Sequence, residues 1–174
     1  MKFVMSMTAC ALSALTLSFG AFAQDDATPE AGGAYNIINQ NSGLCLKVAN
    51  NSYAENASII QSADCNSTAA QWNYVDRGNG WYSVRNNYSG LCLAVHNGSG
   101  QLGTPAVQIS NCDSTAAQWV AQWYQAYVRL YVRHSGLCLG IEGGSAYGGS
   151  KAVQTDACTS RAAQWYFVNL HSRP

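Results

Sequence analysis

Apolar and polar residues alternate in short runs along this chain, with the period of two that is typical of β-strands. In the segment 44–48 two leucines and a valine alternate with cysteine and lysine, and the same alternation returns at 91–95 and 137–141. Six further runs have strand character: 35–38, 58–61, 81–85, 106–109, 127–133 and 166–168. Clusters of Gly, Asn and Ser separate the runs, and no helical period of ten residues follows the first 23 residues. The pattern predicts about twelve short strands and an all-β fold.

One motif occurs three times. Ser-Gly-Leu-Cys-Leu stands at 42–46, 89–93 and 135–139, and each copy is followed by a second cysteine and then by Ala-Ala-Gln-Trp, which ends at Trp72, Trp119 and Trp165. A period of about 46 residues indicates a repeat architecture, with repeats at 35–78, 79–125 and 126–170. Four-stranded repeats are also typical of propeller blades, but propellers need at least about four blades. Three copies are therefore expected to close around a threefold axis.

Seven cysteines are present, and all except Cys10 belong to the repeats. Three equally spaced pairs in an exported chain are typical of a disulfide framework, whereas zinc sites prefer close pairs such as C-x-x-C, which are missing here. Because the repeats should be equivalent, symmetry selects one pairing and no metal site is predicted. The expected disulfides are Cys45–Cys65, Cys92–Cys112 and Cys138–Cys158.

The first 23 residues have the character of a signal peptide: a basic start, an apolar run and the small-x-small sequence Ala21-Phe22-Ala23. A membrane anchor and a lipoprotein attached at Cys10 are the alternatives. Cleavage near Ala23 would place the chain outside the cytoplasm, in the extracellular space or the periplasm. Residues 24–34 are expected to form a flexible tail. No later stretch has the roughly 20 apolar residues that a membrane span needs.

Charge and composition exclude several functions. Nine basic residues balance nine acidic ones, so no electrostatic footprint for nucleic acid is expected. The three histidines are isolated, and no nucleophile elbow, zinc-protease motif or phosphate loop occurs. The sequence therefore predicts no catalytic residues, no enzyme activity and no cofactor. The roughly 150 residues after the leader are enough for one domain with a core.

The triplicated Gly-Leu-Cys-Leu, the Gln before the second cysteine and the Gln-Trp ending resemble the ricin-B-type β-trefoil lectins over 35–170. The resemblance implies a six-stranded barrel capped by three hairpins. It also implies that Trp72, Trp119 and Trp165 lie in the core and that each repeat can carry a shallow sugar pocket. Trp123 and Tyr124 lie outside the repeated positions, and a core role is expected for them, with an exposed aromatic patch as the alternative.

Departures from the family concern the sugar pockets. Galactose-binding members have an Asp two residues after the first cysteine, where this chain has Lys47, Ala94 and Gly140. The usual Gln-x-Trp ending is replaced by Ala-Gln-Trp in all three copies. The resemblance therefore predicts the fold but not galactose specificity.

Other residues could bind sugar, because sugars present C–H faces to aromatic rings and hydroxyls to polar groups. Loop tyrosines with a nearby acid favour repeats one and three, and repeat two ranks lowest. An alternative role for the glutamines is to satisfy backbone groups of the fold. The candidate residues are Tyr53, Gln61, His96, Asn97, Gln108, Glu142, Tyr147 and Gln154.

Two functions fit this sequence. The first is a secreted carbohydrate-binding module whose weak glycan contacts, not directed at galactose, gain strength from multivalency; its partners would be glycans or glycoproteins. The second is a trefoil that has lost sugar binding and docks a protein, as a toxin-associated receptor-binding subunit would.

Overall fold

Short strands joined by turns and loops make up the fold. The computed structural model of the chain describes residues 29–170. Its strands are β1 (Ala34–Asn39), β2 (Cys45–Val48), β3 (Ile59–Ser62), β4 (Gln71–Asp76), β5 (Tyr82–Asn86), β6 (Cys92–Val95), β7 (Ala106–Ile109), β8 (Trp119–Tyr124), β9 (Tyr127–Val132), β10 (Cys138–Ile141), β11 (Ala152–Thr155) and β12 (Trp165–Asn169). The runs identified in the sequence correspond to all of these except β4, β8 and β11. Those three are fixed by antiparallel pairing with β5, β9 and β10, because strand formation depends on the partner more than on intrinsic propensity.

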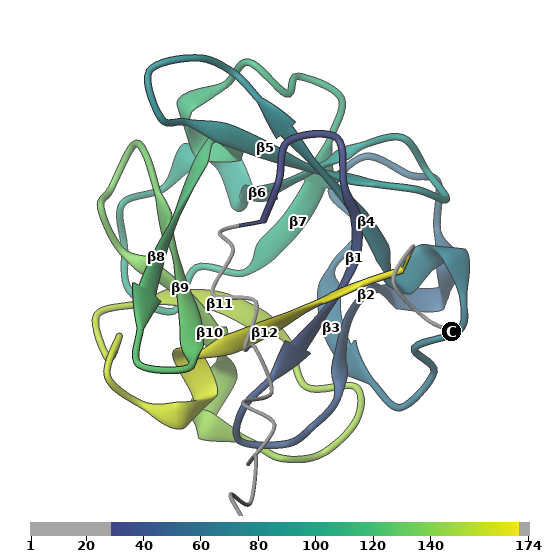
Figure 1. Cartoon of the computed structure of the whole chain (residues 1–174), viewed down its shortest axis with the longest axis vertical. Helices are drawn as coiled ribbons and strands as arrows, with labels where there is room; N and C mark the ends of the chain where they lie inside the picture. The colour runs from purple at the N-terminus through teal and green to yellow at the C-terminus, as the bar shows by residue number, and fades with distance from the viewer. Residues whose placement is uncertain (1–28, 171–174) are drawn as a thin grey trace, which may run out of the picture.

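Six of the strands close into a barrel. Going round it, β1 pairs with β4, β4 with β5, β5 with β8, β8 with β9, β9 with β12, and β12 with β1. The hairpins β2–β3, β6–β7 and β10–β11 extend from this barrel in three similar sectors (Figure 1). Single bridges join the hairpins to one another at Ser58–Val107, Ile60–Lys151 and Pro105–Val153. The all-β, threefold arrangement confirms the expected β-trefoil.

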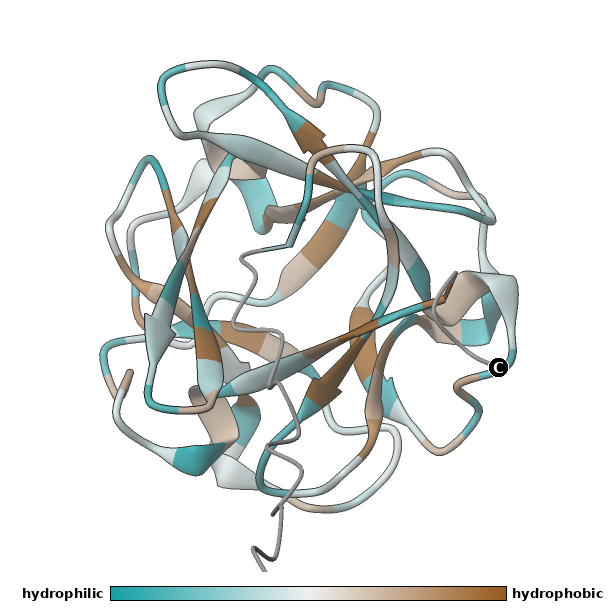
Figure 2. Ribbon diagram, viewed as in Figure 1, coloured by the Kyte–Doolittle hydropathy of each residue, from teal (hydrophilic) through white to brown (hydrophobic). Residues whose placement is uncertain are grey.

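The apolar segments of the strands face a common core, and the connecting loops are mostly polar (Figure 2). Trp72, Trp119 and Trp165 are among its largest buried side chains, each at most 1% exposed. Their indole Nε1 atoms donate hydrogen bonds to the backbone oxygens of Leu46, Leu93 and Leu139 at 2.8, 2.8 and 3.0 Å. Since a buried indole N–H needs a partner, these bonds fix each tryptophan against the first hairpin strand of its own repeat.

Single-turn 3₁₀ helices occur at two places in each repeat. One follows the first hairpin strand: η1 (Ala49–Asn51), η3 (His96–Gly98) and η5 (Glu142–Gly144). The other precedes the Gln-Trp ending: η2 (Thr68–Ala70), η4 (Thr115–Ala117) and η6 (Arg161–Ala163). Ser67, Ser114 and Ser160 cap the second set by accepting a hydrogen bond from the backbone N–H two residues later. This capping explains why a serine precedes the buried alanine pair in every copy.

Disulfides join Cys45 to Cys65, Cys92 to Cys112 and Cys138 to Cys158, which confirms the predicted pairing. The Cα atoms of the pairs are 5.5, 5.5 and 5.8 Å apart, within the usual range for a disulfide. Each bond links the start of a hairpin to the segment that leads into the second 3₁₀ turn. In the chain-entropy account, closing a loop of this length stabilises the fold by about 3 kcal/mol.

The predicted signal peptide and the first part of the predicted tail lie outside the described residues, and both remain predictions. At the N-terminal end of the described residues, Gly32 N–H donates to Tyr74 O at 2.7 Å, and Glu30 N–H donates to the Tyr35 hydroxyl at 2.9 Å. Between residues 29 and 170, no helix is long and apolar enough to span a membrane.

One expectation about the core is wrong. Trp123 and Tyr124, at the end of β8, are 37% and 38% exposed. The reason is their place at the tip of the β8–β9 hairpin, where Trp123 pairs with Val128 and Tyr124 with Tyr127. They form part of an exposed aromatic surface, the alternative that the sequence also allowed.

Truncating a core tryptophan should be costly. Trp119→Ala removes a fully buried ring together with its Nε1 hydrogen bond, so we expect the free energy of unfolding to fall by about 3–5 kcal/mol. Trp123→Ala, four residues along the same strand, is the matched control and should lose much less because that ring is partly in solvent. Chemical denaturation of both variants measures the difference. Equal losses would contradict a core role for Trp119.

Candidate functional site

Three buried glutamines join each hairpin to the loop of another repeat. Gln61 is fully buried; its Nε2 donates to Ser145 O and Tyr147 O at 2.9 and 2.7 Å, and its Oε1 accepts from the Ser42 hydroxyl at 2.7 Å. Gln108 makes the corresponding bonds to Ser52 O, Ala54 O and the Ser89 hydroxyl. Gln154 makes them to Ser99 O, Gln101 O and the Ser135 hydroxyl. The serine of the repeated Ser-Gly-Leu-Cys motif thus orients the glutamine of its own repeat.

These contacts favour the alternative prediction, that the glutamines satisfy backbone groups of the fold. Both N–H groups and the carbonyl oxygen of each amide are engaged within the protein, and Gln61, Gln108 and Gln154 are 0% exposed. A ligand would have to break two or three buried hydrogen bonds to reach them. The amides bind backbone carbonyl groups of the loop in the preceding repeat, and a role in sugar binding stays a prediction.

A cavity of about 330 Å³ lies over the hairpin of repeat three. Its floor includes Gly140 and its rim includes Glu142 and Ser160, while Gly103 is contributed by the loop of repeat two. A Cβ atom at Gly140 would lie 2.8 Å from Thr155 Cγ2 and 3.3 Å from Ala163 Cβ, so the strand and the 3₁₀ turn approach this closely only because the residue is glycine. The cavity combines apolar residues with one carboxylate, that of Glu142, and the hydroxyl-bearing residues Thr155 and Ser160.

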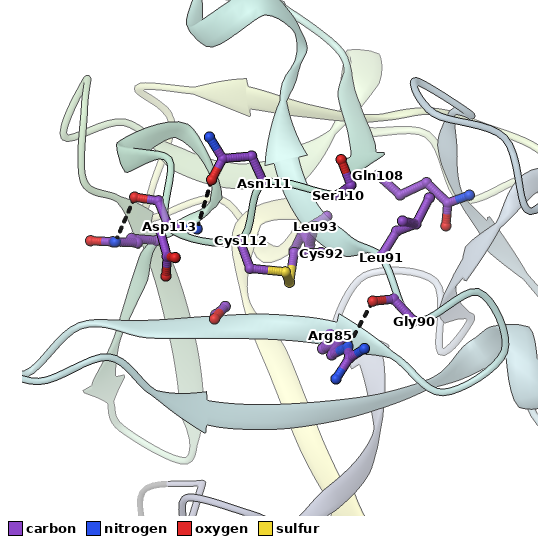
Figure 3. The surroundings of a disulfide bond; sticks show 12 residues. Arg85, Gly90, Leu91, Cys92, Leu93, Gln108, Ser110, Asn111, Cys112 and Asp113 are labelled. Carbon is purple, nitrogen blue, oxygen red and sulfur yellow. Dashed lines mark hydrogen bonds between the residues drawn. A yellow bond between two sulfur atoms is a disulfide. The ribbon is translucent and has the colours of Figure 1, made fainter.

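Repeat two has a cavity of about 250 Å³ at the equivalent place. Asn97, Asn111 and Ser114 line it, together with Asn56 from the loop of repeat one. In the chain, Asn111 lies between Ser110, which follows β7, and Cys112 of the Cys92–Cys112 disulfide, and its Oδ1 accepts from Asp113 N–H at 3.2 Å (Figure 3). The sequence ranked repeat two lowest because it lacks a tyrosine in its own loop. In the structure, Asn56 from the loop of the preceding repeat lines this cavity beside Asn97 of repeat two's own turn.

In repeat one, an ion pair occupies the corresponding positions. Lys47 stands where repeat three has Gly140, and Asp64 stands where it has Ala157. The Lys47 ammonium lies 2.6 Å from the Asp64 carboxylate, and the Lys47 side chain is only 11% exposed. The hydrogen bond from Lys47 lowers the pKa of Asp64. Of the three equivalent places, this one is filled by the protein's own charged side chains.

Each first 3₁₀ turn contains a residue in the left-handed conformation. Asn50, Asn97 and Gly143 have φ values of 53°, 54° and 60°, a conformation that Asn and Gly adopt most readily. Of the predicted site residues, Asn97 lines the repeat-two cavity, and Glu142 and the fully buried Gln154 line the repeat-three cavity. His96 is half-buried and precedes Asn97 in the same turn.

The predicted tyrosines lie on loops that reach the next repeat. Tyr53 is 63% exposed and stacks on Tyr88 of repeat two, with 4.3 Å between ring centroids. It lies three residues before Asn56, which lines the repeat-two cavity. Tyr147 is 82% exposed, and its backbone oxygen accepts from Gln61 of repeat one. The sequence assigned each tyrosine to its own repeat; the structure brings each one next to the following repeat.

The family model of the ricin-type beta-trefoil lectin domain-like proteins matches residues 21–109, half of the chain. The chain belongs to this family. No curated protein sequence matches it. Among solved structures, the designed threefold-symmetric protein ThreeFoil is 32% identical, with a TM-score of 0.77 over 79% of this chain and 99% of that one.

Other similar structures belong to larger proteins or to lectins. An exo-beta-1,3-galactanase from Clostridium thermocellum is 26% identical, with a TM-score of 0.77. The match covers 83% of this chain but only 31% of the enzyme. The ricin B-like lectin of Macrolepiota procera, solved with lactose, is 19% identical with a TM-score of 0.70, covering 81% of this chain and 98% of the lectin. At that identity the likeness shows the shared fold alone.

Ionisable side chains are few around the hairpin cavities. Within the described part of the trefoil, no group of three His, Cys, Asp or Glu side chains could hold a metal ion. Glu142 is the one carboxylate among the residues that line the repeat-three cavity, whereas glycoside hydrolysis uses two opposed carboxylates. Non-enzymatic carbohydrate binding is the function that the lectin family suggests.

The glutamine contacts can be tested through stability. Gln108→Leu keeps the approximate volume but leaves the oxygens of Ser52 and Ala54 without their buried donor, so we expect a loss of about 1–3 kcal/mol in unfolding free energy. Gln101→Leu, on an exposed loop side chain, is the control. Thermal and chemical unfolding of both variants give the comparison. A silent Gln108→Leu would contradict the structural role.

Proposed function

We propose that this chain is a secreted carbohydrate-binding module that holds glycans without cleaving them. The observation that carries the proposal is the open cavity over the repeat-three hairpin, which recurs in repeat two with different lining residues. A volume of about 330 Å³ is at the lower end of the roughly 300–1,000 Å³ found for small-ligand sites. A single sugar unit of a longer glycan is the ligand that this size favours.

In the repeat-three cavity, Glu142 is proposed to accept hydrogen bonds from sugar hydroxyls. Its carboxylate is exposed at the rim and can accept two such bonds. The Ser160 hydroxyl can donate or accept beside it, and the apolar wall formed by Ile141 and Ala162 can contact a C–H face. In repeat two, Asn97 and Asn111 would replace the carboxylate by neutral amides. The two cavities should therefore differ in affinity.

Tyr53 and Tyr147 are proposed as stacking platforms next to the hairpins that their loops reach. Both are far more exposed than a tyrosine needed for the core, and a flat ring of this kind packs well against the C–H face of a sugar. Tyr53 is held in place by Tyr88. Several weak sites on one rigid chain would bind a branched or polymeric glycan with avidity.

The ion pair in repeat one favours the second function in part. A lysine and an aspartate that neutralise each other over the hairpin are what a repeat that has lost sugar binding would show. If all three repeats have lost it, the trefoil would dock a protein instead, as a receptor-binding subunit does. A glycan array on the wild type, run beside a pull-down on glycosidase-treated and untreated secreted proteins, distinguishes the two functions.

Removing the rim carboxylate should weaken glycan binding. With the strongest array glycan as the ligand, Glu142→Ala should lower affinity about tenfold or more, because a hydrogen bond to a charged group contributes roughly 1.5–3 kcal/mol. Asp156→Ala removes an equal charge from an exposed position that does not line the cavity, and it should bind as the wild type does. Titration calorimetry measures both. Parallel losses in the two variants would place the site elsewhere.

Simple galactosides should bind poorly. In galactose-binding members this position provides a carboxylate acceptor, but here it holds Lys47, Ala94 or Gly140. We therefore expect the affinity for lactose to be lower, by about tenfold or more, than that of a site with the carboxylate. Titration of lactose into the wild type checks this, and tight binding would contradict it.

A Tyr53→Ala, Tyr147→Ala double variant should also lose array signal if the stacking platforms are correctly placed.

A further inference from the structure

The outer face of the barrel carries a second surface, away from the hairpin cavities. Along β9, Val128, Leu130 and Val132 point into the core and are at most 1% exposed. The alternate positions of β9 face outward. With the residue just after the strand, they read Tyr-Arg-Tyr-Arg. We call the following set the tyrosine–arginine face: Tyr127, Arg129, Tyr131 and Arg133, with Tyr124 of β8 and Tyr166 of β12.

The tyrosines of this face form a continuous row across three strands. Tyr124 is opposite Tyr127 in the β8–β9 pairing, and the rings of Tyr127 and Tyr166 lie 4.8 Å apart, edge to face. Tyr124 and Tyr166 are 38% and 40% exposed. A hydrogen bond with Tyr166 lowers the pKa of the Tyr127 hydroxyl. Exposed rings in a row are suited to stacking on successive sugar units.

Arg129 lies in this face with unused hydrogen-bonding capacity. Its guanidinium carbon is 3.4 Å from the centre of the Tyr124 ring. Its Nε and Nη2 atoms are shielded from water and have no hydrogen-bond partner among residues 29–170. These two nitrogens form one edge of the guanidinium fork, the edge that takes a carboxylate through two parallel bonds. A ligand would reach them by displacing the ring of Tyr124 at the exposed hairpin tip.

The charged side chains in the segment between Asp113 and Glu142 are all positive. Between Asp113 and Glu142 the chain has no acidic residue but contains Arg129 and Arg133, and neither forms an ion pair in the described structure. Arg133 donates to Gln118 Oε1 at 2.6 Å, a neutral partner. Positions four apart on a strand are separated by about 13 Å. An extended ligand with regularly spaced anions fits this arrangement better than a single small anion does.

From this geometry we propose that the tyrosine–arginine face binds an acidic saccharide chain, with sugar rings stacked on the tyrosines and carboxylates paired with Arg129 and Arg133. This site is independent of the hairpin cavities, since none of its residues lines either one. It would let one trefoil hold a neutral glycan at a hairpin and a polyanionic glycan on the barrel wall.

The test uses polygalacturonate as the probe and its fully methyl-esterified form as the neutral match. The wild type should bind the acid form, more weakly as salt is raised, and the ester at least tenfold more weakly. Arg129→Gln should reduce binding of the acid about tenfold or more, and Arg129→Lys should restore only part of it because the fork is lost. Arg85→Gln, on the outer side of β5, is the charge-matched control and should change affinity less than twofold.

Three further measurements keep the outcome clear. Tyr166→Ala should weaken binding without touching Arg129, and unfolding midpoints show whether each variant is folded. A saturating amount of the strongest array glycan should leave polygalacturonate binding unchanged, which separates this site from the hairpin cavity. Equal binding of the ester, an unaffected Arg129→Gln, or polyglutamate binding as tight as polygalacturonate would overturn the proposal, the last in favour of an acidic protein partner.

Discussion

Each hairpin of this trefoil is joined to the loop of the preceding repeat by a buried amide: Gln61 to the 145–147 loop, Gln108 to 52–54 and Gln154 to 99–101. The backbone of the same glutamine adds two more hydrogen bonds to that loop. A buried carbonyl without a donor is costly, so the three contacts must form together. They hold the repeats in a closed ring and set where every loop lies.

The binding surface follows from that ring. Because each loop reaches its neighbour, a cavity is bounded by two repeats: Gly103 of repeat two lines the repeat-three cavity, and Asn56 of repeat one lines that of repeat two. The residue two after the first cysteine differs between the repeats. Glycine lines the cavity of repeat three, where a Cβ atom would clash with Thr155, and a lysine paired with an aspartate stands there in repeat one. Equivalent backbones thus give three different sites.

The barrel wall departs from the threefold pattern, because its outward residues take no part in closing the ring. The outer positions of β9 hold Tyr127, Arg129 and Tyr131, whereas the corresponding residues of the other repeats are different in kind. These side chains contact one another, as Arg129 does with the Tyr124 ring and Tyr127 with Tyr166. Their difference from the equivalent positions of the other repeats is the reason that we propose a ligand for this face.

The sequence alone determined the repeats and the disulfide pairing, because the alternation of apolar residues and the symmetry of the cysteines are local and repeated three times. The resemblance of the repeated motif to the ricin-B-type lectins added the β-trefoil and the core position of the tryptophans. The sequence also placed Asn97 and Glu142 in the loop after the first hairpin strand, where the structure has a 3₁₀ turn. Only the tertiary structure decided the rest. Whether Gln61 faces a sugar or a neighbouring loop, and which hairpin Tyr53 adjoins, depends on contacts between residues distant in the chain. Those contacts leave no mark on the spacing of one repeat, and they exist only once the ring is closed.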